Sequence, residues 1–198
     1  QPRKRLLALG NSYHGDTFGA MSAGARSAFS EPFAPFLFDV THIPTPVPGM
    51  EEETLKQLKA ELEKGDVAAF IFEPKVQGAG GMLMYSEEVL EAMMKMVKEY
   101  DALLIADEVM TGFYRTGNPF GTSNTTIKPD IMSLSKGLTG GTLALGLTLC
   151  NTTIYDAFLS QEKVKTFFHG HSFTANPIAC ATALASLDLF EREETLQN

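Results

Sequence analysis

Two oppositely charged side chains, Asp107 and Lys136, each stand at the end of a short apolar run. A lone charge buried beside such a run is costly, so Asp107 needs a cationic or hydrogen-bond-donating partner. A lysine amine can attack a carbonyl group, and a carboxylate can hold a proton on the nitrogen of an aromatic ring. The pair therefore suits chemistry on a small heterocycle that is held at both ends.

Three interpretations of Asp107 compete. It could simply cap a helix or form a salt bridge. It could hold Mg²⁺ in a nucleotide-binding module, because an apolar strand followed by an acid is typical of P-loop enzymes. That module needs G-x-x-x-x-G-K-[ST] upstream, and the string does not occur in the sequence. The third interpretation is a partner for the pyridine nitrogen of pyridoxal phosphate, and Lys136 favours this one.

The elements that must position these side chains are predicted from hydrophobic periodicity and capping residues. Strands are expected over residues 4–9, 67–72, 102–106, 130–134 and 145–150, and helices over 50–64 and 86–100. Asn176 and Pro177 are expected to open a long Ala-rich helix, and residues 29–50 and 115–129 read as irregular loops. Alternating strands and helices predict an α/β fold whose mostly parallel central sheet is flanked by helices on both faces.

The predicted strand ends converge on one edge of this sheet. Ligands of open α/β sheets bind beyond the carboxyl ends of the strands. The side chains that follow the strands are Tyr13, His14, Asp16, Glu73, Asp107 and Lys136. An aromatic ring, several carboxylates and a lysine at one edge predict a small-molecule site.

The overall composition narrows the function classes. The 198 residues carry 16 basic and 24 acidic side chains, a net charge of −8, which argues against nucleic-acid or anionic-membrane partners. Cys150 and Cys180 fit a reducing compartment, and we expect a cytoplasmic protein. His169 and His171 have no third ligand nearby, so no metal site is predicted. The chain does not start with Met, which is typical of a piece of a longer protein.

Five segments together resemble the class III pyridoxal-phosphate-dependent aminotransferases. They span residues 12–22, 72–82, 104–117, 129–141 and 168–177, in the family's order. The resemblance implies a fold-type I enzyme with pyridoxal 5'-phosphate as cofactor, and a homodimer with its sites at the subunit interface. It also implies that residues 1–198 are part of the large cofactor-binding domain. The upstream phosphate loop and the C-terminal small domain would then lie outside this sequence.

Within the class, the motifs are most similar to the subfamily of biotin synthesis that converts 8-amino-7-oxononanoate to 7,8-diaminononanoate. The resemblance implies S-adenosylmethionine as amino donor, with lysine as the second choice. Relatives acting on 4-aminobutyrate or ornithine typically carry Glu where Ala79 stands. Another class III transaminase or an aminomutase, acting on one of these or another ω-amino substrate, is the alternative.

The resemblance also implies roles for residues near the cofactor. Lys136 matches the Schiff-base lysine, which becomes the base that moves a proton from the substrate Cα. Asp107 would keep the pyridine nitrogen protonated. Val109 would pack on one face of the ring, or belong to the core. Tyr13 would stack on the other face or line the substrate cleft.

The resemblance also implies roles for residues that contact the substrate or reach the neighbouring subunit. Gly170, His171 and Ser172 resemble the segment that reaches the cofactor of the other subunit, where Ser172 would bind the phosphate and Gly170 would admit the substrate. Asp16 could receive the donor's ammonium group or cap the following helix. Arg115 could line the substrate cleft or hold its own loop in place.

Overall fold

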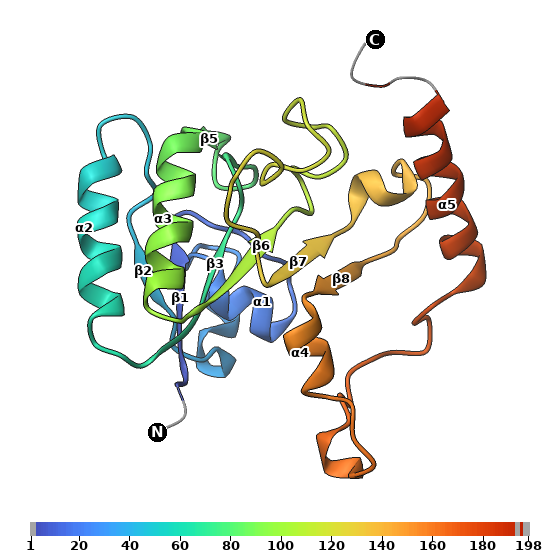
Figure 1. Cartoon of the computed structure of the whole chain (residues 1–198), viewed down its shortest axis with the longest axis horizontal. Coiled ribbons are helices and arrows are strands. Elements are labelled where there is room, and N and C mark those ends of the chain that lie inside the picture. The colour runs from blue at the N-terminus through green and yellow to red at the C-terminus, as the bar shows by residue number, and fades with distance from the viewer. Residues whose placement is uncertain (1–2, 193–194, 196–198) are drawn as a thin grey trace.

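The central feature of the computed structural model, which describes residues 3–192 and 195, is a six-stranded sheet in the order β2-β1-β3-β6-β7-β8 (Figure 1). The strands are β1 (Arg5–Leu9), β2 (Thr41–Ile43), β3 (Val67–Phe72), β6 (Leu103–Asp107), β7 (Ile131–Leu134) and β8 (Leu147–Cys150). All neighbouring pairs are parallel except β7 and β8, which run antiparallel. Short strands β4 (Val76–Gln77) and β5 (Leu83–Met84) form a separate antiparallel pair. The predicted α/β fold with a mostly parallel sheet is confirmed.

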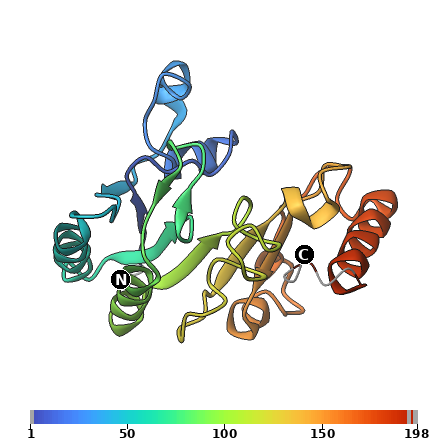
Figure 2. The same cartoon turned by 90° about the horizontal axis from the view of Figure 1, so that it is seen from above.

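Helices cover the two faces of the sheet unequally. The helices are α1 (Phe18–Ala23), α2 (Glu51–Leu62), α3 (Glu87–Glu99), α4 (Thr152–Asp156) and α5 (Pro177–Arg192), with 3₁₀ turns at Glu31–Phe36, Lys136–Thr139 and Lys163–Lys165. Helices α2 and α3 pack side by side on one face, and α1 lies on the other (Figure 2). Helix α5 lies at the far end, against the turn that follows β7.

Helix α3 forms where the sequence predicts a helix, and for the predicted reasons. The Ser86 hydroxyl accepts a hydrogen bond from the Val89 main-chain nitrogen at 3.3 Å, a cap that contributes about 1 kcal/mol. The face that points into the core is fully buried at Leu90, Met93 and Met94. Burial of each such side chain contributes about 1.5–3 kcal/mol, so packing rather than capping holds the helix on the sheet.

Two predicted features differ from the structure. The stretch 29–50, expected to be irregular, contains β2 and the 3₁₀ turn Glu31–Phe36. The sheet, expected to be covered on both faces, leaves every residue of the edge strand β8 exposed in the described part of the chain. Leu147 and Leu149 are 42% and 44% exposed, because no described helix packs on that strand.

A charged cluster joins β1 to the turn that precedes β3. The Arg5 guanidinium bonds to Asp66 Oδ1 at 2.7 Å and also contacts Glu61, which in turn pairs with Lys64. Lys64 and Arg5 lower the pKa of Glu61, and Arg5 lowers the pKa of Asp66. The cluster therefore links two segments that are distant in sequence.

We expect Arg5→Ala to lower the free energy of unfolding by about 1 kcal/mol at neutral pH. Because the pKa values of both carboxyls are depressed in the folded state, their stabilisation is present above the unfolded pKa of about 4 and is lost as the pH falls below it. Urea unfolding of the complete protein should therefore show a difference between wild type and variant that disappears in acid. Lys59→Ala, which removes an exposed pair with Glu63, is the control.

Within residues 3–192 and 195, no helix combines the length and the apolarity that crossing a bilayer requires.

Candidate functional site

Three parallel strands bring the candidate residues to one edge of the sheet. Phe72 of β3 pairs with Ala106 of β6, and Asp107 of β6 pairs with Ser133 of β7. The residues that follow these strands therefore meet, as the rule for open α/β sheets predicts. Glu73 comes directly after β3, and Lys136 comes two residues after β7.

A cavity of about 260 Å³ lies at this edge. It is lined by Tyr13, His14, Gly15, Glu73, Ala79, Asp107, Val109, Met110 and Lys136. Its volume is close to the lower end of the range of small-molecule sites, about 300 Å³. The structure thus brings together Tyr13, Asp107, Val109 and Lys136, and with them His14 and Glu73 from the predicted strand ends.

Asp107 ends β6 almost completely buried, with 7% of its surface exposed. Its Oδ2 lies 2.7 Å from Nδ1 of His14, and its Oδ1 accepts the Val109 main-chain N–H at 3.1 Å. Because a carboxylate can only accept, His14 donates from Nδ1. The other ring nitrogen of His14 is buried and has no hydrogen-bond partner among the described residues.

His14 is the partner that Asp107 needs, although from the sequence it is only one of the side chains beyond the strand ends, without a role of its own. The two residues are 93 positions apart, so spacing along the chain gives no direct sign of the pair. The available signal was the position of His14, directly after Tyr13 beyond the first strand. His14 and Asp107 can be recognised as neighbours only when the strand order is known.

Lys136 begins the 3₁₀ turn Lys136–Thr139 with a left-handed backbone, at a φ of 44°. For a residue with a side chain this conformation costs about 1–3 kcal/mol and is found mostly where the surroundings impose it, often at functional sites. Lys136 is exposed and lines the same cavity as the buried Asp107. Lys75 also has a positive φ, of 65°, so it is the placement in the cavity that distinguishes Lys136.

Tyr13 and Glu73 form another part of the cavity wall. Glu73 is 5% exposed, and its burial raises its pKa above the ordinary value, although two main-chain N–H donors oppose the shift. Tyr13 is 45% exposed, and desolvation followed by the neighbouring Asp16 carboxylate raises the pKa of its phenol. Tyr13 therefore stays protonated at neutral pH and can donate a hydrogen bond.

Two glycines let the loop after β3 approach its neighbours closely. A Cβ at Gly80 would lie 2.0 Å from the carbonyl oxygen of Asn11, and one at Gly78 would lie 2.0 Å from the sulfur of Met110. The contact at Gly80 is with backbone, which cannot move aside as a side chain can.

We expect Gly80→Ala to destabilise the complete protein by about 1–3 kcal/mol, because the methyl group overlaps main-chain atoms. Gly19→Ala is the matched control: Gly19 lies in α1, and nothing lies within 4 Å of the point that its new methyl group would occupy. That substitution should be neutral or stabilise the helix by up to about 1 kcal/mol. Thermal unfolding of the two variants measures the difference, and equal melting temperatures would contradict the expected overlap.

The remaining predicted residues lie outside the 260 Å³ cavity. Asp16 lines an adjoining hollow of about 460 Å³, which shares Tyr13 and Ala79 with the cavity. Arg115 is exposed in the loop between β6 and β7. Gly170, His171 and Ser172 are exposed in the segment before α5. Of these three, His171 lines a separate hollow of about 690 Å³ with Ser135 and Asn176.

Glu108, next to Asp107, has a structural role. It is fully buried, and its carboxylate accepts hydrogen bonds from the main chains of Gly121 and Thr122 at 2.8 and 2.9 Å. The hydroxyls of Thr111 and Thr122 also donate to it. Glu108 therefore fixes the fold of the loop that carries Arg115.

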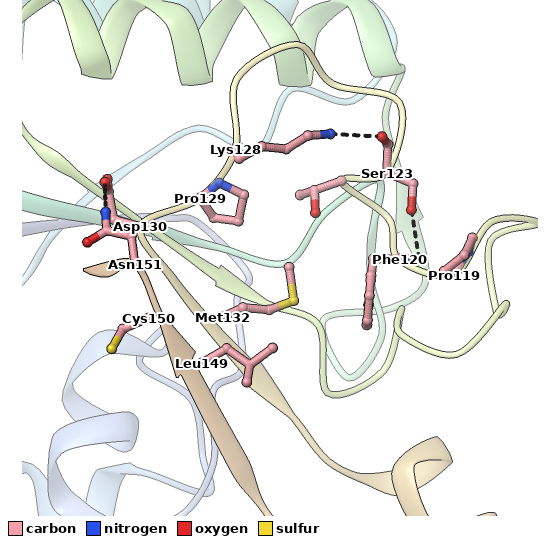
Figure 3. A pocket seen from close by; sticks show the side chains of 11 residues that line it. Pro119, Phe120, Ser123, Lys128, Pro129, Asp130, Met132, Leu149, Cys150 and Asn151 are labelled. Atoms are coloured by element: carbon pink, nitrogen blue, oxygen red, sulfur yellow. Dashed lines mark hydrogen bonds between the residues drawn. The ribbon is translucent and has the colours of Figure 1, made fainter. Parts of the chain in front are cut away.

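A further hollow, of about 520 Å³, lies between the loop before β7 and the strands β7 and β8 (Figure 3). Met132, Leu149 and Phe120 give it an apolar lining. Asp130, at its rim, precedes β7 and so marks the amino ends of the strands. The hollow is thus distinct from the cavity at the carboxyl ends.

No group of three or more His, Cys, Asp or Glu side chains in residues 3–192 and 195 is arranged to hold a metal ion.

Comparisons with known proteins identify the family of this chain. The family described as "Aminotransferase class-III" matches residues 1–198. The adenosylmethionine-8-amino-7-oxononanoate aminotransferase of Synechococcus elongatus is 50% identical over 204 residues, which cover 99% of this chain and 48% of that protein.

Two of the similar solved structures match nearly the whole chain. The crystal structure of adenosylmethionine-8-amino-7-oxononanoate aminotransferase from Methanocaldococcus jannaschii has a TM-score of 0.93 at 39% identity, covering 100% of this chain and 46% of that one. A PLP-bound amine transaminase from an uncultivated Pseudomonas species has a TM-score of 0.89 at 34% identity, with coverages of 97% and 46%.

The chain spans about half the length of the curated relatives it matches. The family match extends over all 198 residues, and the sheet edge with its cavity lies inside it. The chain belongs to the class-III aminotransferase family.

Proposed function

We propose that the complete protein is a pyridoxal-phosphate-dependent aminotransferase of biotin synthesis. It would move an amino group to 8-amino-7-oxononanoate to give 7,8-diaminononanoate, with S-adenosylmethionine as donor. The observation that carries the proposal is the placement of Lys136 and the buried Asp107 on one small cavity, in a chain that is 50% identical to an aminotransferase of that name.

The residues around the cavity fit the cofactor. When bound, pyridoxal phosphate supplies an aldehyde that carries the amino group and a pyridine ring that accepts electrons. Asp107 is buried and oriented by His14 and by the Val109 N–H, so its carboxylate can hold a proton on a ring nitrogen. The volume of about 260 Å³ suits a single aromatic ring.

Different side chains of this protein have different roles in the proposed amino transfer. Lys136 Nζ would take the proton from the substrate Cα and deliver it to C4′ of the cofactor. Val109 and Tyr13 both line the cavity. Val109 would pack against one face of the ring, and the Tyr13 phenol would line the other side, where it could donate a hydrogen bond. Ala79 adds no charge to the wall, which disfavours the 4-aminobutyrate and ornithine alternatives.

Single-turnover spectra of the complete, cofactor-loaded protein test the substrate assignment. We expect S-adenosylmethionine to change the visible absorbance of the bound cofactor, and subsequent addition of 8-amino-7-oxononanoate to restore it with formation of 7,8-diaminononanoate. Lysine is the second donor to test. A response to ornithine or 4-aminobutyrate alone would overturn the biotin assignment and leave the aminotransferase assignment standing.

The proposal also covers the domain organisation, the oligomeric state and the compartment of the complete protein. Residues 1–198 would belong to the large cofactor-binding domain, with a phosphate loop and a small domain contributed by other parts of the complete protein. Gly170, His171 and Ser172 would act across a homodimer interface, where their exposure suits contact with a second subunit. Asp16 and Arg115 would contact substrate. The free cysteines Cys150 and Cys180 suit the cytoplasm.

A further inference from the structure

We infer that Glu73 is a positioning residue for the amino transfer proposed above: its carboxylate joins the two loops that form one wall of the cavity. The inference rests on the proposed function for its kinetic consequence. The contacts themselves do not depend on it.

The two oxygens of Glu73 accept from different loops. Oε1 accepts the main-chain N–H of Tyr13 at 3.1 Å, from the loop after β1. Oε2 accepts the main-chain N–H of Gly78 at 3.0 Å, from the loop after β3. Glu73 is 5% exposed and lines the cavity, so water does not readily replace either bond. One buried side chain therefore sets the distance between the two loops.

A second set of contacts ties the same loops together. The fully buried Gln77 donates from Nε2 to the carbonyl of Gly10 at 2.8 Å. The Thr45 hydroxyl lies 2.9 Å from Gln77 Oε1 and 2.5 Å from the Gly10 carbonyl, and its single proton can be donated to either of these acceptors. The close approach of Gly80 to Asn11 adds a backbone contact between the loops. We call the two loops, residues 10–16 and 73–81, the paired wall.

The paired wall carries substrate-facing groups and leaves the reacting groups elsewhere. Tyr13 and Ala79 lie on it, and both line the cavity as well as the adjoining hollow that holds Asp16. Asp107 ends β6 and Lys136 begins the turn after β7, so neither reacting group belongs to the paired wall. Loss of the bonds to Glu73 therefore acts directly on the loop positions of Tyr13 and Ala79, and so on how a substrate enters and is oriented. Asp107, which His14 of the paired wall contacts, keeps its separate bond from the Val109 N–H.

The substitution Glu73→Gln tests this role because it removes a hydrogen-bond acceptor without changing the size of the side chain. The amide has nearly the same shape, but one oxygen accepts and the NH₂ group only donates. One of the N–H groups of Tyr13 and Gly78 then loses its acceptor and faces a donor. The control is Asp130→Asn. Asp130 is also a buried carboxylate that accepts a main-chain N–H, that of Leu104 at 2.8 Å, and it pairs in addition with Lys98, but it lies at the amino ends of the strands, away from the cavity.

Hydrogen exchange of the cofactor-free complete protein provides a readout that needs no activity. In Glu73→Gln we expect exchange at Tyr13 or Gly78 to become about tenfold faster or more, while strands β3 and β6 are unchanged. In Asp130→Asn the accelerated amide should be Leu104, with the paired wall unaffected. Equal acceleration over the whole molecule in Glu73→Gln would overturn the inference.

Steady-state kinetics of the loaded enzyme provide the second readout. We expect Glu73→Gln to lower kcat/KM by about tenfold or more, mostly through KM for the amino substrate, because misplacement by a fraction of an ångström is costly. Cofactor absorbance should be retained, and Asp130→Asn should change kcat/KM by less than about twofold. Equal kinetic effects of the two variants would contradict a positioning role.

The two proposals fail in distinguishable ways. If wild type transfers no amino group, the proposed function fails, and the exchange result still reports on the wall. If Glu73→Gln does not fold, Gln77→Leu probes the same wall by removing the donor to Gly10. Faster exchange over residues 10–13 in that variant supports the inference, and unchanged exchange there overturns it.

Discussion

Lys136→Ala is expected to lower kcat of the complete protein by about 10⁴-fold or more, because the variant loses both the amine that engages the cofactor and the base that moves the proton. Borohydride reduction should couple the cofactor covalently to the Lys136 peptide in wild type, as a mass increment, and to no peptide in the variant. Measured together, the two effects separate loss of the amine from a general loss of stability.

Lys95→Ala is the control for this experiment. Lys95 pairs with Glu91 on α3, at 3.0 Å, away from the sheet edge. We expect this variant to keep its activity and its covalent labelling. Labelling of a lysine other than Lys136 in wild type would refute the assignment of the amine.

Asp107→Asn is expected to lower kcat/KM by about 10²–10³-fold, because a neutral amide no longer holds a charge opposite the ring nitrogen. The variant also leaves His14 without the carboxylate that accepts from its Nδ1. Substrate turnover measured at saturating cofactor distinguishes a loss of chemistry from weaker cofactor binding.

Asp101→Asn is the matched control for Asp107. Asp101 is a well-exposed acid in the turn before β6, paired with Arg3 at 3.4 Å. Its substitution changes a charge without changing the cavity, so kcat/KM should stay within about twofold of wild type. Activity of Asp107→Asn equal to that of this control would exclude Asp107 from the reaction.

Much of the fold could be predicted because local patterns agree with global packing. The apolar run 67–72 becomes β3, and the periodic face of Leu90, Met93 and Met94 becomes the buried face of α3. The rule on carboxyl strand ends placed Asp107 and Lys136 together, since it needs only strand positions and parallel pairing.

The remaining features depend on contacts between distant segments. The direction of β8 could not be predicted, because an apolar run looks the same in parallel and antiparallel strands. Strand β2 lies in a proline-rich stretch and forms only by pairing with β1. The His14–Asp107 pair requires the strand order, and the roles of Asp16, Arg115 and residues 170–172 stay predictions.

The exposure of β8 has a practical consequence for handling residues 1–198 in isolation. The free edge of β8 presents a row of main-chain N–H and C=O groups flanked by the exposed Leu147 and Leu149. Another polypeptide in an extended conformation can pair with this edge as an added strand. Such a truncated polypeptide would tend to precipitate as fibrillar material when concentrated, and a charged solubilising substitution such as Leu149→Lys would counter this tendency.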